Sequence, residues 1–270
     1  MTIYTRIIFF VFILCSLFIS FTARANNEVA LTIDDLPFVG KTDGDSGKYR
    51  REQGRFMAVL QTLEQEHVPA TGFVVAGAIE PGQMEWLEQF KQAGNIIGSH
   101  SYSHKSLGRT PIDVYIDDVK KADKILAPLM SSPKYYRFPY LSEGAGTSKF
   151  TEFRDYLRAN NYVVAPVTIV TDDSRYNLRF LNIPWQQRKQ YLDSYRKQYL
   201  NYIWSQTLAA ERKTEKLAGH PVKQILLIHM NTLNSLVLPD IIQMFRSHGY
   251  TFITLPEALK DPFYKNDTQI

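Results

Sequence analysis

The chain has 270 residues, enough for one large domain or two small ones with a sizeable buried core. Hydrophobic residues make up 44% and charged residues 21%, which is a globular rather than a disordered composition. The 31 Lys and Arg exceed the 27 Asp and Glu by only four, too few to indicate nucleic-acid binding. Cys15 is the only cysteine, so a disulfide framework and a cysteine-rich zinc module are both excluded.

The first 25 residues are typical of a secretory signal peptide. They contain one early arginine, Arg6, an uncharged apolar run over 7–21 and the sequence Ala-Arg-Ala at 23–25. The apolar run is shorter than the roughly 20 residues of a membrane span, although a retained N-terminal anchor stays an alternative. We therefore expect a mature chain over 26–270 that contains no cysteine and is exported to the periplasm or secreted.

Strand and helix patterns alternate along the rest of the chain, which predicts parallel βαβ units. Apolar runs typical of buried strands cover 29–33, 70–75, 95–99, 135–138, 162–169, 224–229 and 250–254. Helical patterns cover 50–66, 84–93, 112–130, 147–160, 184–219 and 238–247. About seven such units favour an α/β barrel over an open sheet.

The segment 175–219 differs from the rest in composition. It holds nine Lys or Arg against three acidic residues, and its aromatic residues recur at helical spacing. Two interpretations remain open, and they can hold for opposite faces of the segment. It forms amphipathic helices that cover a face of the barrel, or a basic, aromatic wall beside a groove that binds a polymer.

Four groups of polar residues follow predicted strands, at the edge of a parallel sheet where sites are built. The first pair is Asp34 and Asp35; neighbours on an extended strand point in opposite directions, so the two carboxylates could serve different tasks. A solvated turn is the alternative for this pair.

His100 and His104 come next, at a spacing that places both on one face of a helical turn and suits zinc. Incidental histidines at a helix start are the alternative.

The other two groups are Arg137 with Tyr140, and His229. Arg137 always carries charge and can bind a carboxylate bidentately, or it is a surface arginine beside a turn. His229 follows four aliphatic residues, which places it at the mouth of the sheet. A partly buried histidine there is a candidate general acid, or a structural residue.

In this order, the four motifs resemble those of the polysaccharide deacetylase family, carbohydrate esterase family 4, which contains the nodulation-type chitooligosaccharide deacetylases. The resemblance spans roughly residues 29–259. It implies a distorted (β/α) barrel of about seven strands, formed by a single catalytic domain over 26–270, with the basic helical segment at 175–219 as part of it.

The resemblance also implies a role for each motif residue. Asp34 matches the catalytic base and His229 the catalytic acid. Arg137 matches the residue that orients the base, and the residue at Tyr140 provides a backbone N–H to the oxyanion. The implied metal ligands are Asp35, His100 and His104, and the implied metal is zinc, or cobalt or another divalent ion.

The chain departs from the family pattern at three positions. Val170 stands where the family has an Asp, Ser174 where a Trp lines the acetyl pocket, and Asn231 where many relatives have Asp. Asp173 is retained and is predicted to help hold Arg137. The loss of the Trp leaves the identity of the acyl group open.

The resemblance therefore predicts a metal-dependent hydrolase that removes N-acetyl groups from an envelope or extracellular glycan of the peptidoglycan or chitin type. Its partner is the N-acetylated glycan, with neither nucleic acid nor a stable membrane span after signal removal. An O-acetyl esterase or a small-amide hydrolase on the same scaffold is an alternative. A non-catalytic glycan-binding module is another, although binding alone needs neither a base nor an acid.

Overall fold

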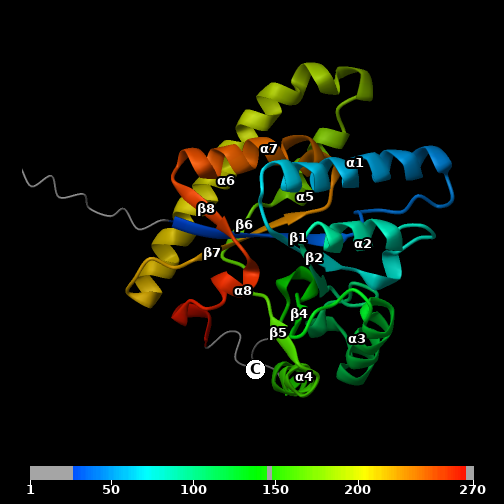
Figure 1. Ribbon diagram of the computed structural model, residues 1–270, viewed down its shortest axis with the longest axis vertical. Helices are drawn as coiled ribbons and strands as arrows, with labels where there is room; N and C mark the ends of the chain where they lie inside the picture. The colour runs from blue at the N-terminus through cyan, green and yellow to red at the C-terminus, as the bar shows by residue number, and fades with distance from the viewer. Residues whose placement is uncertain (1–26, 145–147, 266–270) are drawn as a thin grey trace, which may run out of the picture.

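The computed structural model describes residues 27–144 and 148–265, so the predicted signal peptide at 1–25 lies outside the described residues. Within them, eight parallel strands form one sheet that curls into an open half-barrel (Figure 1). The strands are β1 (Asn27–Leu36), β2 (Ala70–Val74), β3 (Ile96–Ser99), β4 (Lys134–Tyr136), β5 (Tyr162–Val164), β6 (Ile169–Val170), β7 (Gln224–His229) and β8 (Tyr250–Ile253). The predicted distorted α/β barrel is confirmed.

Helices connect the strands and cover the sheet. They are α1 (Ser46–Gln65), α2 (Met84–Gln92), α3 (Ile112–Leu126), α4 (Ser148–Ala159), α5 (Asp173–Leu181), α6 (Trp185–Ala218), α7 (Thr232–Ser247) and α8 (Leu255–Ala258). Short 3₁₀ turns are η1 (Ala76–Ala78), η2 (Leu107–Arg109), η3 (Pro139–Leu141) and η4 (Pro262–Tyr264). In Figure 1, α1 and α7 lie side by side along β1, and Arg246 of α7 pairs with Glu66 at the end of α1. None of the helices in the described ranges combines the length and the apolar character that crossing a membrane requires.

The strand order places β1 in the middle of the sheet. Seven strands follow the order β5-β4-β3-β2-β1-β7-β6, and β8 pairs with the first residues of β1. β1 and its neighbour β7 are buried over most of their length, as expected for parallel strands with both faces covered. The carboxyl ends of β1, β3 and β7, which carry the motif residues, consequently meet at one edge.

One predicted strand, over 162–169, is wrong. The structure divides it into β5, which pairs with β4, and β6, which pairs with β7, at opposite ends of the strand order. Pro166 lies between them and has no N–H to donate to a ladder, which explains the interruption. The segment between β5 and β6 therefore crosses from one edge strand to the other.

The predicted helix over 184–219 is confirmed as α6, which begins after Pro184 and ends at Gly219 in the left-handed conformation. Its tyrosines pack against Tyr176 of α5, with ring centroids 5.0–6.1 Å apart for Tyr195, Tyr199 and Tyr202. These contacts favour the interpretation that the basic segment covers a face of the barrel.

The helix predicted over 238–247 begins earlier than expected, at Thr232. Pro239, which is typical of a first helical turn, lies inside α7 instead. Asn231 caps the helix by accepting a hydrogen bond from the backbone of Asn234. This earlier start places the N-terminus of α7 beside the carboxyl end of β7.

Candidate metal and catalytic site

The sheet brings all four predicted motifs together at its carboxyl edge. Asp34 on β1 and His229 on β7 are directly paired in the strand register. His100 follows β3, whose last residue pairs with β4, and the backbone N–H of Arg137 donates to Ser99 at 3.0 Å. The sequence separation of these residues is large, but neighbouring strands lie only about 4.8 Å apart.

Three side chains form a candidate metal site. Ligand atoms of Asp35, His100 and His104 all lie within 4.8 Å of one another. Oδ1 of Asp35 is 3.3 Å from Nε2 of His104 and 3.7 Å from Nε2 of His100. That oxygen is buried without a hydrogen-bond partner in the described part of the chain, which is costly unless a cation binds it. One carboxylate and two imidazoles suit zinc and leave a fourth position open.

The two adjacent aspartates do not face opposite sides of a regular strand as predicted. The register of β1 shifts between Ile33 and Leu36, and Asp35 has a φ of 61°. Nε2 of His100 is consequently close to both carboxylates, 3.6 Å from Asp34 Oδ2 and 3.7 Å from Asp35 Oδ1. The bulge directs both side chains into one site.

The predicted helical turn at the two histidines is also wrong. His100 and His104 lie on a loop after β3, in which Ser101 and His104 have positive φ values of 66° and 54°. The Oγ of Ser101 accepts a hydrogen bond from the backbone of His104. The two imidazole rings still meet, with centroids 4.8 Å apart. The left-handed residues of the loop therefore bring the two imidazole rings together, as the predicted helical turn would have done.

Asp118 of α3 holds this loop and was missed by sequence reasoning. Its buried carboxylate accepts hydrogen bonds from the backbone N–H groups of Tyr102 and Ser103, at 2.9 and 3.0 Å, and from the hydroxyl of Ser103. The sequence pattern shows Asp118 only as one of several polar residues on an amphipathic helix, so its contact with the loop could not be predicted.

The buried imidazole of His100 has the tautomer and the charge that binding a metal requires. Its Nδ1 donates to the carbonyl of Arg137 at 2.8 Å, which leaves the lone pair on Nε2 toward the carboxylates. Burial lowers the pKa of His100 to about 3, against the opposing charge of Asp35, so the ring is neutral at physiological pH. A neutral ring is the form that binds metal.

Asp34 and Arg137 form a buried pair. Nη1 of Arg137 lies 3.5 Å from each carboxylate oxygen of Asp34. Burial raises the pKa of Asp34 above its ordinary value, and the charge of Arg137 partly opposes this. Arg137 is held by the carbonyl of Ala165, at 2.6 Å, and by the ring of Phe73, 4.6 Å from the guanidinium. The crossing segment between β5 and β6 thus fixes the arginine.

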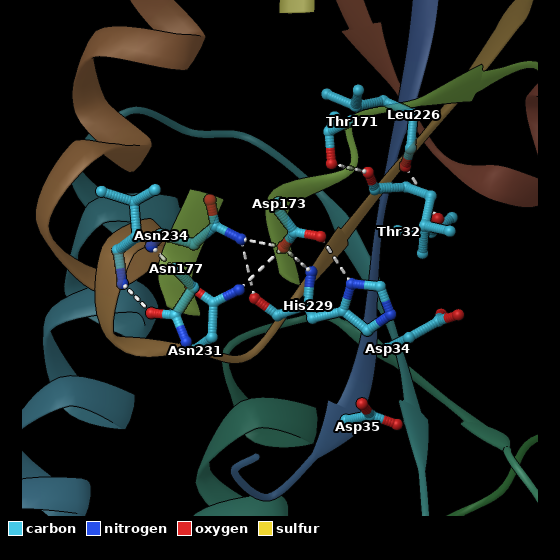
Figure 2. A network of polar contacts seen from close by, with 12 residues as sticks. Thr32, Asp34, Asp35, Thr171, Asp173, Asn177, Leu226, His229, Asn231 and Asn234 are labelled. Atoms are coloured by element: carbon cyan, nitrogen blue, oxygen red, sulfur yellow. Dashed lines mark hydrogen bonds and ion pairs between the residues drawn. The ribbon is translucent and has the colours of Figure 1, made fainter. Parts of the chain in front are cut away.

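His229 does not stand free at the mouth of the sheet, because Asp173 holds its imidazole ring (Figure 2). Asp173 Oδ1 lies 2.7 Å from Nδ1 of His229, and its Oδ2 accepts from the backbone N–H of His229 at 2.7 Å. The expectation that Asp173 helps hold Arg137 is wrong, because its hydrogen bonds go to His229 and to the amides of Asn231 and Asn234. Neither asparagine was predicted to contribute to this network.

The same network determines how His229 titrates. Burial alone would lower the pKa of His229, but the charge of Asp173 and its hydrogen bond outweigh burial and raise the pKa to about 9. Burial opposes ionisation of Asp173 too, yet contact with His229 lowers the pKa of Asp173 below its ordinary value. The pair is therefore an imidazolium and a carboxylate at neutral pH, with the His229 side chain 22% exposed to the cavity.

Tyr140 forms a wall of the site. It has a φ of 60° inside η3, and its side chain is 70% exposed. The ring packs edge to face on His104, with centroids 4.6 Å apart. Tyr140 therefore lies next to the candidate metal ligands.

A cavity of about 420 Å³ joins these residues. Its polar lining includes Asp34, Asp35, His100, His104, Asp173 and His229. Val170 and Ser174, two of the three departures from the family pattern, line the same cavity together with Leu141. The volume lies in the range of small-molecule pockets.

The fold and site define the class of protein, and comparison with known sequences agrees. The polysaccharide deacetylase family pattern matches residues 22–159, slightly more than half of the chain, and the chain belongs to this family. The match includes Asp34, Asp35, His100, His104, Arg137 and Tyr140; Asp173 and His229 lie beyond it.

Two characterised relatives match part of the chain. A peptidoglycan N-acetylglucosamine deacetylase of Bacillus cereus is 32% identical over 42% of this chain and 36% of its own length. A chitin deacetylase of Colletotrichum lindemuthianum is 30% identical over 44% of each. The matched region thus spans less than half the length of either relative.

Solved structures share the fold over more of the chain. The polysaccharide deacetylase Bc1974 of Bacillus cereus has a TM-score of 0.60 at 21% identity, covering 84% of this chain and 91% of its own. A pseudoenzyme of the same family from Bacillus anthracis has a TM-score of 0.58 at 16% identity, covering 87% of this chain and 66% of its own. Since both share the fold, activity has to be argued from the site residues.

Proposed function

We propose that this protein is a metal-dependent deacetylase that hydrolyses the acetamido group of an N-acetylated glycan. The observation that carries the proposal is the buried Oδ1 of Asp35, which has no hydrogen-bond partner among the described residues and lies beside His100 and His104, in one cavity with Asp34 and His229. Simple glycan binding needs no such combination of a cation site, a base and an acid.

Asp35, His100 and His104 hold the metal in this proposal, and zinc fits the donor set. When bound there, the divalent cation activates water and polarises the amide carbonyl as a Lewis acid. The backbone N–H of Tyr140 stabilises the negative charge that develops on the carbonyl oxygen.

Two residues move protons in the reaction. Asp34 accepts a proton as the water oxygen bonds to the carbonyl carbon, and the charge of Arg137 favours its ionised form. His229, held as an imidazolium by Asp173, donates a proton to the nitrogen as the C–N bond breaks. The products are acetate and a free amino sugar.

The substrate is an envelope or extracellular glycan, and the protein acts in the periplasm or after secretion. The signal-like sequence at 1–25 and the peptidoglycan and chitin substrates of the relatives support this. Ser174 lines the cavity at the position where the family has a Trp, so the acyl groups that the enzyme accepts have to be determined by assay.

Acetate release from a panel of N-acetylated glycans, with added zinc or cobalt, tests the proposal. We expect release from at least one glycan, and loss of release after chelation. O-acetylated xylan and a small acetamide in the same panel distinguish an esterase or a small-amide hydrolase. No release from any N-acetylated glycan would refute the proposed function. His100→Ala that keeps full metal content would refute the ligand assignment.

A further inference from the structure

A second cavity adjoins the catalytic one. It has a volume of about 490 Å³, and His104 and Tyr140 line both cavities. The exposed ring of Tyr140, packed on His104, stands between them. Because the two cavities share these lining residues, an oligosaccharide that occupies both of them would run past Tyr140.

The two cavities differ in charge. Four carboxylates line the catalytic cavity, those of Asp34, Asp35, Asp172 and Asp173, and three of them have cationic partners in Arg137, Arg175 and His229. The second cavity is lined by Lys105 and Arg109, with hydroxyl groups from Ser106, Thr110 and Ser142, and none of its lining residues is acidic. An anionic part of a ligand would consequently bind more favourably in the second cavity than in the catalytic one.

The two cations of the second cavity are not neutralised by neighbouring groups. In the described ranges, neither Lys105 nor Arg109 forms an ion pair with a carboxylate. Lys149 brings a third positive charge to the same place, since its Nζ donates to the carbonyl of Thr110 at 2.8 Å. Glu143, the nearest acid along the chain after Tyr140, lines a different cavity beside Arg137.

We propose that the second cavity binds an anionic substituent, a carboxylate or a phosphate, on the sugar next to the one that is deacetylated. The inference rests on the proposed function and narrows its substrate class to acidic N-acetylated glycans. The planar guanidinium of Arg109 binds either oxyanion bidentately, and Lys105 adds a point charge. Arg109 is thus a specificity-determining residue.

Three oligosaccharides of equal length test this inference: a neutral N-acetylated one, one with carboxylates and one with phosphates on alternate sugars. The measurement is kcat/KM for acetate release at low salt. We expect a preference of about tenfold for at least one anionic oligosaccharide, the scale of one charged hydrogen bond. The two anionic substrates show which group the cavity accepts.

Two variants, Arg109→Gln and Lys105→Gln, should each bring the ratio of kcat/KM for the anionic and the neutral oligosaccharide closer to one. Lys213→Gln on the exposed side of α6 removes the same charge elsewhere and should leave the preference intact. Sodium chloride at high concentration should weaken the preference, because exposed charges are screened. Equal kcat/KM values for all three substrates, or a full preference in both cavity variants, would overturn the inference.

Binding measurements distinguish a failure of the proposed deacetylase function from a failure of the proposed anionic site. If no oligosaccharide releases acetate, the proposed function fails, and calorimetric titration of the wild-type protein with the same three compounds decides the inference. Tighter binding of an anionic oligosaccharide that is lost in Arg109→Gln supports the anionic site. Equal affinity for the neutral and anionic compounds contradicts it.

Discussion

Asp34 and His229 are register partners on adjacent strands, which places a buried carboxylate beside a partly exposed imidazole. Each has its own supporting partner, Arg137 for the first and Asp173 for the second. The two groups are close in space, and the partner of each favours the charged form of its side chain, as the proposed base and acid of one reaction require.

Asp34→Asn removes the base and keeps the size of the side chain. We expect acetate release to fall by about 10²–10⁴-fold, the usual contribution of general base catalysis, while the metal content is retained. Elemental analysis and acetate assays measure the two quantities. Asp155→Asn, at an exposed ion pair of α4, is the matched control. Near wild-type turnover in Asp34→Asn would refute the role of the base.

The pH dependence of turnover should report on His229. The acid acts while it is protonated, so kcat/KM should decline as the pH rises through the pKa of about 9. Asp173→Asn removes the charge that raises this pKa against burial, and the alkaline limb should move to lower pH. The stability that this ion pair contributes is present below the unfolded pKa of about 6.5 and is lost as the pH rises through about 9.

A pH series of kcat/KM on both proteins measures the position of that limb. The Asp155→Asn protein serves again as the control and should keep the wild-type profile. An alkaline limb at the same pH in Asp173→Asn would show that this carboxylate does not set the titration of the acid.

Among the elements, α3 supports the loop that carries two of the proposed metal ligands, through hydrogen bonds to Asp118. Asp118→Ala would leave two backbone N–H groups and one hydroxyl of the ligand loop without their acceptor. We expect zinc affinity to fall by about 10–100-fold, as for other groups that position metal ligands. Competition with a chelator measures it. Asp117→Ala, the exposed neighbour on the same helix, should bind zinc as the wild type does, and an equal affinity in both variants would contradict this role.

Periodicity was enough to predict most strands, and strand-end placement predicted which side chains the fold brings to one edge of the sheet. The wrong predictions of local backbone around the candidate site share one physical cause. Asp35, Ser101, His104 and Tyr140 all have positive φ, which non-glycine residues adopt rarely and which side-chain patterns do not reveal. The bulge in β1 and the loop after β3 could therefore not be predicted from spacing, although both determine where the ligands point.

Long-range pairing was the other property that the sequence pattern could not supply. The apolar run over 162–169 looks like one strand, but its two halves pair with β4 and β7. The partner of Asp173 was missed for the same reason, since only the β6–β7 pairing brings it to His229. A pattern along the chain predicts strands, whereas their neighbours depend on the complete sheet.

At the scale of the molecule, the site draws on strands on both sides of the central strand β1. The proposed metal ligands come from β1 and from the loop after β3, while the proposed acid comes from β7 and its partner from the start of α5. Since the ligands are brought together only in the folded chain, metal binding should be linked to folding of the whole sheet.

Thermal unfolding measures this linkage without any substrate. Zinc at about 100 times its Kd should stabilise the folded state by about 2.7 kcal/mol, which corresponds to a rise in Tm of about 5–10 °C for a chain of this size. His100→Ala removes one ligand, and the rise on adding zinc should largely vanish, whatever the variant's Tm without metal. Lys213→Gln, far along α6, should show the full rise. An equal zinc-induced shift in wild type and His100→Ala would place the cation elsewhere, because only binding that depends on His100 couples this site to the stability of the sheet.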